Sequence, residues 1–186
     1  MFSNALTTTG TYSAREIQLF EKEVTHRQVQ KGTVLLSKGE ICKSLFFLLQ
    51  GAVHQYEFNS ASDLRVVDLH TANEWFLNHQ SFVSQTPSEH AIAAFTDIEI
   101  FEISIESIHY LIAQSSAFLQ LNKILAFPAS RLHLFDNALT PLQKYQFIFE
   151  HRPQLLQAFP LKMIASFLKI TPETLSRVRE KFAKAI

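Results

Sequence analysis

The chain has 186 residues with 17 basic and 17 acidic side chains, so its formal net charge is zero. Hydrophobic residues make up 47% and charged residues 18%, which excludes a disordered chain and is typical of a folded globular protein. One cysteine, Cys42, excludes an intramolecular disulfide framework, a cysteine-rich zinc module and an all-cysteine iron–sulfur cluster. The sequence has no signal-peptide pattern and no apolar run of about 20 residues. We therefore expect a cytoplasmic protein that does not enter a membrane.

The first half of the chain predicts one helix and then a β-rich unit. Residues 1–12 are expected to form a loose polar arm. Ser13-Ala14-Arg15-Glu16 has capping-box spacing and predicts a helix over residues 14–23. From Val24 to Ile103, short apolar runs alternate with turn-prone pieces, as in an antiparallel sandwich or jelly roll. The predicted strands are Thr33–Ser37, Leu45–Gln50, Ala52–Phe58, Leu64–His70, Ala91–Phe95 and Ile98–Ile103.

After Ser104 the periodicity becomes helical. The spacing of apolar residues from Ile105 to Ile112 predicts one helix, and a second, longer helix is predicted around Phe118–Leu125. Pro128 costs about 3 kcal/mol inside a helix, so this linking helix must bend or end there. Thr140-Pro141-Leu142-Gln143 then predicts a new helix that ends near His151. We expect an N-terminal unit at 1–104, a linking helix region at 105–138 and a helical tail at 139–186.

The tail has the spacing of a helix-turn-helix. A helix of about two turns is predicted at 161–168, and Thr171 with Pro172 can begin a second one. Ala165 supplies the small residue that is needed where the two helices cross. The expected core positions are Ile164, Leu168, Ile170, Leu175, Val178 and Phe182, with Leu161 on the same face. The joining turn holds Lys169 where glycine is usual, at a cost of roughly a kcal/mol if φ is positive there.

The second tail helix presents side chains suited to DNA. Arg177 can bind guanine O6 and N7, and Glu173 can accept a hydrogen bond from cytosine N4. The expected phosphate contacts are Lys162, Lys169, Thr171, Thr174, Ser176 and Lys181. A basic helix can also be a solvated face, but the bihelical spacing before it favours DNA reading. The formal charge is +5 over residues 138–186 and −5 over the rest, so overall neutrality is compatible with this prediction.

At these residues the chain resembles the Crp/Fnr family of bacterial transcription regulators, most closely its short Bacteroidetes-type members. The resemblance rests on Gly39-Glu40, Gly51, Glu102-Ile103-Ser104 and, most strongly, TPETLSRVREKF in the tail. It implies an α+β protein with a cyclic-nucleotide-binding-like β-roll, a long linking and dimerisation helix, and a C-terminal helix-turn-helix. It further implies a homodimer on a palindromic double-stranded DNA operator, with RNA polymerase as a further partner. Because the sequence stops at Ile186, the helix-turn-helix is expected to have no β-wing.

The effector site departs from the family pattern. Family members that bind cyclic AMP hold its phosphate with a Gly-Glu pair and an Arg-Ser pair, where this chain has Leu77-Asn78 and Ser88-Glu89. Without that arginine and glycine, we expect no cyclic AMP binding in the usual manner. Any other effector would meet a pocket formed by Trp75, Phe76, Asn78, Phe82, Ser88 and Glu89, although aromatic residues in a roll are more often core.

No metal or cofactor is expected, since no pair among His54, His70, His79 and His90 has the i, i+4 helical spacing of a ligand motif. The sequence predicts a DNA-binding transcription regulator. The alternative is a degenerate ligand sensor or interaction module whose tail binds protein. An enzyme is not expected, because no nucleophile–base motif, metal cluster or phosphate loop is present.

Overall fold

The computed structural model describes residues 2–58, 63–126 and 139–184. Its first element is the helix α1 (Phe2–Thr7), so the expectation of a loose N-terminal arm is wrong. Ala5 and Leu6 are buried, and the ring of Phe2 stacks on Phe101 with centroids 4.4 Å apart. These three residues share one helical face, and its burial against the β-rich unit holds the segment in place.

The helix α2 (Ala14–Glu23) has the predicted bounds and cap. The Ser13 hydroxyl accepts a hydrogen bond from the Glu16 N–H, and the Ser13 N–H donates to Glu16 Oε2 over 2.6 Å. This reciprocal pair satisfies two N–H groups that would otherwise lack partners at the start of the helix.

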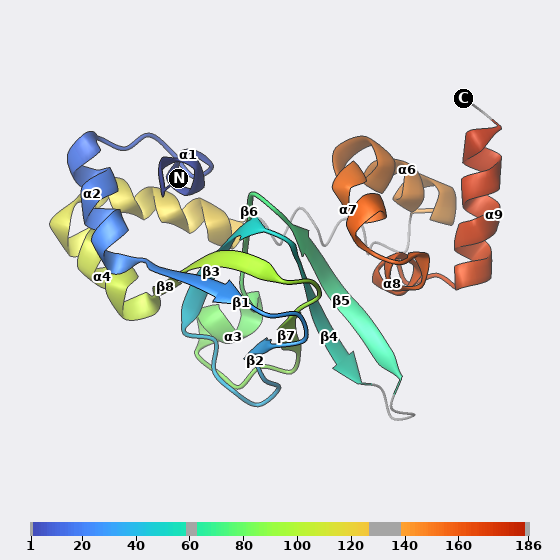
Figure 1. The fold of residues 1–186 in the computed structure, drawn as a ribbon, viewed down its shortest axis with the longest axis horizontal. Coiled ribbons are helices and arrows are strands. Elements are labelled where there is room, and N and C mark those ends of the chain that lie inside the picture. Colours follow the sequence, from blue (N-terminus) through green and yellow to red (C-terminus); the bar gives the residue numbers. More distant parts are fainter. Residues whose placement is uncertain (1, 59–62, 127–138, 185–186) are drawn as a thin grey trace.

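Two four-stranded antiparallel sheets follow and confirm the predicted jelly-roll architecture (Figure 1). The first sheet has the order β1 (Thr25–Val29), β8 (Ile98–Ser104), β3 (Ser44–Gln50), β6 (Glu74–Phe76). The second has the order β2 (Val34–Leu36), β7 (Ala91–Ala94), β4 (Ala52–Phe58), β5 (Leu64–Thr71). Strands β1 and β6 were not predicted, because β1 is largely polar and β6 has only three residues.

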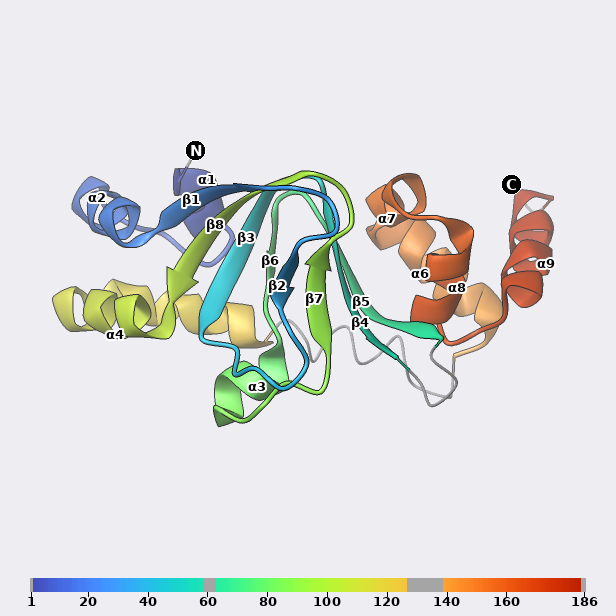
Figure 2. The same ribbon diagram turned by 60° about the horizontal axis from the view of Figure 1, so that its bottom comes forward.

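The main core lies between the two sheets (Figure 2). Among its fully buried members are Leu48, Val53, Ile92 and Ile100, one from each of four strands. The turn between β3 and β4 consists of Gly51 alone, at φ +90°. A side chain there would place Cβ 2.4 Å from the Asp97 carbonyl oxygen, so both the backbone angle and the space require glycine.

The linking region is not one continuous helix. After α3 (His79–Ser84) and β8, the helix α4 (Ile105–Gln114) begins at the Ser104 cap and ends at Ser115, which is extended. The predicted second helix then starts as a 3₁₀ helix, η1 (Ser116–Leu121), and is α-helical over 122–126. At this break the Ser115 hydroxyl donates to Glu16 Oε1 of α2 over 2.6 Å. Pro128 and the rest of the linking region lie outside the described residues.

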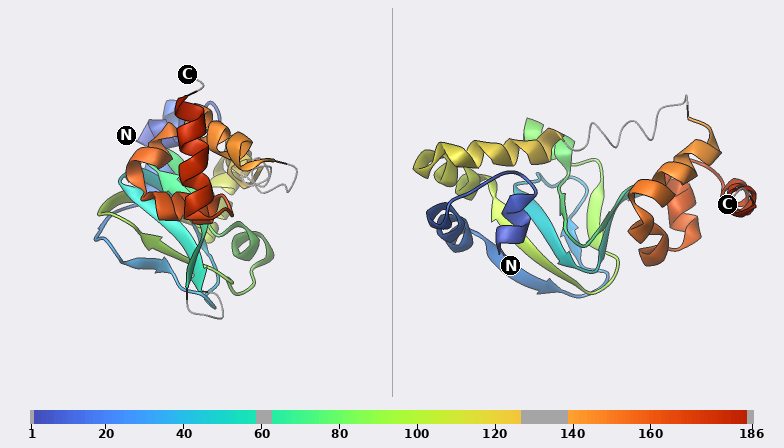
Figure 3. Two further views of the ribbon diagram at one scale, coloured as in Figure 1. Left: turned by 90° about the vertical axis from the view of Figure 1, so that its right-hand side faces the viewer. Right: turned by 90° about the horizontal axis from the view of Figure 1, so that it is seen from above.

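The tail consists of four helices over its described residues. The helix α6 (Pro141–His151) has the predicted bounds and capping box, and α7 (Pro153–Ala158) was not predicted. The helices α8 (Leu161–Phe167) and α9 (Pro172–Ala183) form the predicted pair. They lie at the β4–β5 end of the β-roll (Figure 3). No helix in the described part of the chain is long and apolar enough to cross a membrane.

Hydrogen bonds and a ring contact fasten the tail to the β-roll. The Val66 N–H donates to Ser166 Oγ over 2.9 Å, which connects β5 to α8. The Phe95 and Phe159 rings lie 4.9 Å apart between centroids. Arg152, at the junction of α6 and α7, donates to the Leu69 carbonyl oxygen over 2.8 Å. The same Nη2 lies 2.8 and 2.9 Å from the two carboxylate oxygens of Glu74.

Candidate nucleic-acid interface

The helix α8 is buried on two sides, because it packs on α9 and also on β5. Ile164, Ala165 and Leu168 are fully buried, as predicted from their spacing. Ala165 allows the close approach of the two helices that a helix-turn-helix requires. Leu161 was expected on the same face but is 39% exposed, and Phe167 is fully buried instead. Periodicity along α8 could not predict that this helix also packs on β5.

The turn after α8 is a Schellman motif with lysine in the glycine position. Lys169 has φ +56°, which is the left-handed region. The Ile170 N–H donates to the Ala165 carbonyl over 3.0 Å, and the Lys169 N–H donates to the Ser166 carbonyl over 3.1 Å. The side chain of Lys144, buried beneath this turn, donates to the Leu168 carbonyl over 3.3 Å. Lys169 therefore adopts the positive-φ conformation, which is the energetically costlier of the two that the sequence left open.

The helix α9 begins at the predicted cap. The Thr171 hydroxyl accepts a hydrogen bond from the Thr174 N–H over 3.2 Å, and Pro172 takes the first helical position. Leu175 is buried, while Val178 and Phe182 are half-buried and pack on the tail core. Phe182 meets Tyr145 and Phe149 of α6, with ring centroids 5.5 and 4.9 Å apart. This apolar stripe leaves the opposite face of α9 in solvent.

Glu173 and Arg177 are both exposed on α9, one helical turn apart. Hydrogen bonds from the Glu173 N–H and from the Thr171 hydroxyl lower the pKa of the Glu173 carboxyl, and the positive charge of Arg177 adds to the effect. Glu173 therefore remains an ionised acceptor at neutral pH, which is the form that can accept from a base amino group.

The six candidate phosphate contacts lie on α8, on α9 and in the turn between them. All are exposed except Thr174, which is half-buried with its hydroxyl 3.1 Å from that of Thr171. Lys162 and Thr171 also line a groove between the tail and the β-roll, so part of the candidate DNA interface faces the sensor-like unit. Sequence reasoning missed this groove, because its two walls are far apart in the chain.

The residues expected to form an effector pocket do not gather in one place. Neighbouring residues of a strand point to opposite faces of the sheet, and Trp75 and Phe76 are neighbours in β6. Phe76 stacks on Phe46 in the inner core, with centroids 5.1 Å apart. The Trp75 indole N–H donates to the Ala5 carbonyl over 3.0 Å, beneath α1. The expectation that Trp75 lines the same pocket as Phe76 is therefore wrong.

The other four members of that set are engaged or exposed. Asn78 is buried and caps α3 by accepting from the Ser81 N–H over 3.0 Å. The Ser88 hydroxyl donates to the His90 carbonyl over 2.6 Å. Phe82 is buried in the core, and Glu89 is exposed. At the position of the family's phosphate site, Asn78 caps a helix, Ser88 holds a turn and Glu89 supplies a carboxylate. None of these side chains provides positive charge for a phosphate.

Titratable side chains gather elsewhere, at the β5–β6 hairpin. His70 is 2% exposed, with its ring nitrogens 3.5 Å from Asp68 Oδ2 and 3.6 Å from Glu74 Oε2. The described residues contain no group of three or more His, Cys, Asp or Glu side chains that could hold a metal ion.

Cys42 is buried, and this burial raises the pKa of its thiol, which disfavours the reactive thiolate.

Comparison with known proteins finds a matching family model for the β-roll and solved structures with a similar fold. The family model of the cyclic nucleotide-binding domain matches residues 26–115, from β1 to the end of α4. The catabolite activator protein of Thermus thermophilus is 18% identical, with a TM-score of 0.57 over 93% of this chain and 84% of that chain. FixK2 from Bradyrhizobium japonicum is 16% identical, with a TM-score of 0.68 over 87% of this chain and 85% of that chain. None of the curated proteins matches the sequence.

A CooA variant from Carboxydothermus hydrogenoformans is 17% identical, with a TM-score of 0.66 over 97% of this chain and 83% of that chain. At such identities the likeness establishes the fold, which is the α+β fold of the Crp/Fnr transcription regulators. This confirms the resemblance seen in the sequence. Residues 26–115 are similar to the cyclic nucleotide-binding domain family.

Proposed function

We propose that the protein is a sequence-specific DNA-binding transcription regulator that acts as a homodimer on a palindromic site. The observation that carries this proposal is the α8–α9 pair. Its crossing at Ala165, its tight turn at Lys169 and its capped second helix leave Glu173 and Arg177 side by side in solvent. A helix-turn-helix reads DNA with the first turns of its second helix, where these two residues lie.

Each part of the exposed face has a stated role in this proposal. Arg177 donates two hydrogen bonds to a guanine edge, and Glu173 accepts one from a cytosine amino group. The phosphate contacts come from lysine and hydroxyl side chains around them, and from the N-terminus of α9. They are Lys162, Lys169, Thr171, Thr174, Ser176 and Lys181. The family resemblance adds RNA polymerase as a partner of the DNA-bound dimer.

Selection of duplexes from a random pool by the full-length protein tests the function directly. We expect enrichment of a palindromic sequence, and an affinity that falls steeply with added salt as phosphate contacts release counterions. If no duplex is enriched, or if the affinity does not depend on salt, DNA reading is refuted. Light scattering should report a dimer.

Arg177→Ala tests the assignment of the base-reading residue. We expect the difference in binding free energy between operator and random DNA to shrink by about 1–3 kcal/mol. Arg179→Ala is the matched control, because Arg179 is also exposed on α9 but is not among the base-reading residues. Both variants lose one positive charge, so only the loss of discrimination separates them. An unchanged ratio for Arg177→Ala would show that the assignment is wrong.

We also propose that cyclic AMP is not bound at the family's phosphate position. Leu77 and Asn78 are buried at the start of α3, and Ser88 is held by its bond to the His90 carbonyl. A phosphodiester placed there would meet the charge of Glu89 without a compensating cation. A thermal-shift titration should give no stabilisation by cyclic AMP. A large stabilisation would refute this part of the proposal.

A further inference from the structure

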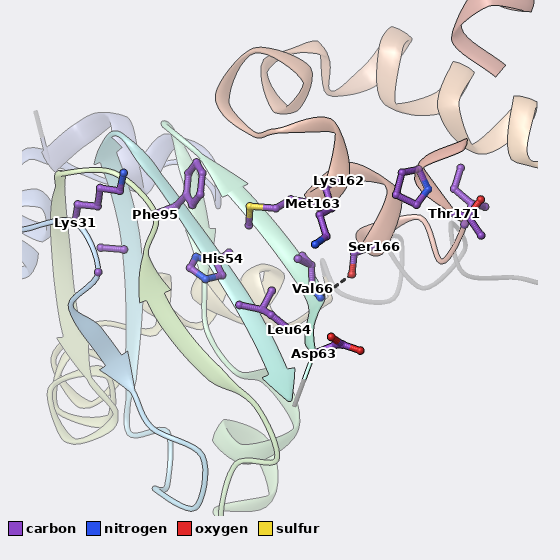
Figure 4. Close-up of a pocket in the computed structure, with 14 residues that line it drawn as sticks. Lys31, His54, Asp63, Leu64, Val66, Phe95, Lys162, Met163, Ser166 and Thr171 are labelled. Carbon is purple, nitrogen blue, oxygen red and sulfur yellow. Dashed lines mark hydrogen bonds between the residues drawn. The ribbon is translucent and has the colours of Figure 1, made fainter. Parts of the chain in front are cut away.

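A groove of about 1030 Å³ lies between the β-roll and the tail (Figure 4). One wall is formed by β4, β5 and the ends of neighbouring strands, and the other by α8 and the start of α9. Its volume is at the upper end of the range of small-molecule sites, which is about 300–1,000 Å³. Because the two walls belong to different functional parts of the chain, an occupant would touch both.

The middle of the groove is apolar. Leu64 and Val66 of β5 and Phe95 after β7 line it from the β-roll, and Met163 of α8 lines it from the tail. The His54 ring also lies in this wall, in edge-to-face contact with Phe95. Burial lowers the pKa of His54, although a backbone hydrogen bond with Ala93 partly opposes this. At neutral pH the imidazole is therefore uncharged and adds to the apolar lining.

Lysine side chains supply positive charge on both walls. Lys31 extends from the β-roll, and Lys162 extends from α8 toward the groove (Figure 4). Both are exposed, and each ammonium sits on a flexible stem. Asp63 is the one carboxylate among the lining residues, so positive charge prevails. An apolar lining with cations on both sides is complementary to an amphipathic anion.

We propose that this groove is an effector site for an apolar carboxylic acid, such as a medium-chain fatty acid. The hydrocarbon body lies against Leu64, Val66, Phe95 and Met163, the carboxylate is held by Lys162, and Lys31 on the opposite wall adds positive charge to the groove. The site lies outside the interior of the β-roll and shares none of the six residues first expected to form an effector pocket.

The position of the groove gives the ligand a consequence for DNA, and this step rests on the proposed function. Lys162 and Thr171 line the groove and are also among the candidate phosphate contacts. A carboxylate bound to Lys162 competes with a DNA phosphate for the same ammonium. The acid therefore lowers the affinity for DNA, and DNA lowers the affinity for the acid by the same factor.

Calorimetric titration of the full-length protein with decanoate tests the site without reference to DNA. We expect saturable binding, and at least tenfold weaker binding of decanol, which has the same chain and no charge. Lys162→Gln should weaken decanoate binding about fivefold, as expected for the loss of one exposed charge contact. Lys38→Gln, at an exposed lysine outside the groove, should leave it unchanged.

Leu64→Glu tests the apolar wall, because it places a negative charge on a side chain that is already 44% exposed and should leave the fold intact. We expect decanoate affinity to fall at least tenfold, while Val83→Glu, on the exposed side of α3, has no effect. Absence of decanoate binding, equal binding of decanol, or equal affinities for Leu64→Glu and the wild type would overturn the site.

A second measurement separates the site from the function. With the selected operator, saturating decanoate should weaken binding of the wild-type protein about fivefold or more and leave Leu64→Glu unaffected. If decanoate binds the groove and the protein selects no DNA, the proposed function fails while the site stands. If operator binding is unchanged by saturating decanoate, the coupling is refuted.

Discussion

Replacing Lys169 by glycine should stabilise the protein, because this lysine occupies a left-handed conformation at φ +56°. For an L-residue, that conformation costs about 1–2 kcal/mol. Glycine avoids the clash of Cβ with the backbone but loses about 0.5–1 kcal/mol more conformational entropy on folding. The difference leaves a net gain of about 1 kcal/mol. The two hydrogen bonds of the Schellman turn involve backbone groups only, so they survive the substitution.

Lys169→Ala is the matched control. Both variants remove the lysine charge and its side-chain contacts, but alanine keeps the Cβ that is strained in the left-handed region. We expect the glycine variant to exceed the alanine variant by about 1 kcal/mol in the free energy of unfolding. In a chain of this size that corresponds to about 2–4 °C in the melting temperature. Urea unfolding and thermal melts of the two variants measure the difference.

If the alanine variant were as stable as the glycine variant, the turn would not hold the strain assigned to it. DNA binding provides an independent comparison. Both substitutions remove one candidate phosphate contact, so both should reduce the salt dependence of DNA affinity by the same amount, about one unit of slope. A difference in slope between the two variants would show that the turn geometry, and not the lysine charge, positions α9 on DNA.

Other predictions concern packing, pH and the tail contact. Ala165→Leu should lower the free energy of unfolding by about 1–3 kcal/mol and abolish operator binding, because no room exists at the helix crossing; intact binding would contradict this. Hydrogen bonds from the Ser115 hydroxyl and from the Ser13 cap lower the pKa of the Glu16 carboxyl below its ordinary value of 4.5. The ionised Glu16 therefore stabilises the fold above pH 4.5, and this stabilisation is lost as the pH falls through the lowered pKa. Glu16→Gln should therefore flatten the acid side of the stability curve in pH-dependent urea unfolding. Arg152→Met should cost about 2 kcal/mol, and a double-mutant cycle with Glu74→Gln should return a coupling energy of similar size.

The sequence predicted those elements whose signals are local. Helices α2 and α6 follow from their capping boxes, and β4 follows from a short apolar run bounded by turn-prone residues. The helix-turn-helix follows from the spacing of Ala165, Thr171 and the apolar positions around them. In each case the residues that decide the structure are within a few positions of one another, so one pass along the chain finds them.

Features that depend on distant contacts were missed or misplaced. Trp75 was expected in the same pocket as Phe76, because the three-residue strand β6, which puts them on opposite faces of the sheet, was too short to be predicted. The packing of α8 on β5, in which Ser166 accepts a hydrogen bond from the Val66 N–H, joins segments about a hundred residues apart in the chain. The conformation of Lys169 could be narrowed to two alternatives from sequence, and only the backbone of the folded turn decides between them.

The strand β5 pairs with β4 in the β-roll and packs against the hydrophobic core of the tail, and this has a consequence for cooperativity. Val66 and Leu69 pack with the buried residues of the tail, and Arg152 of the tail reaches back to the Leu69 carbonyl. A fragment that began at residue 139 would lose this wall and expose the apolar surface around Phe159. We therefore expect the β-roll and the tail to unfold together, so that, under the proposed function, a substitution in β5 alters operator binding without touching a base or a phosphate.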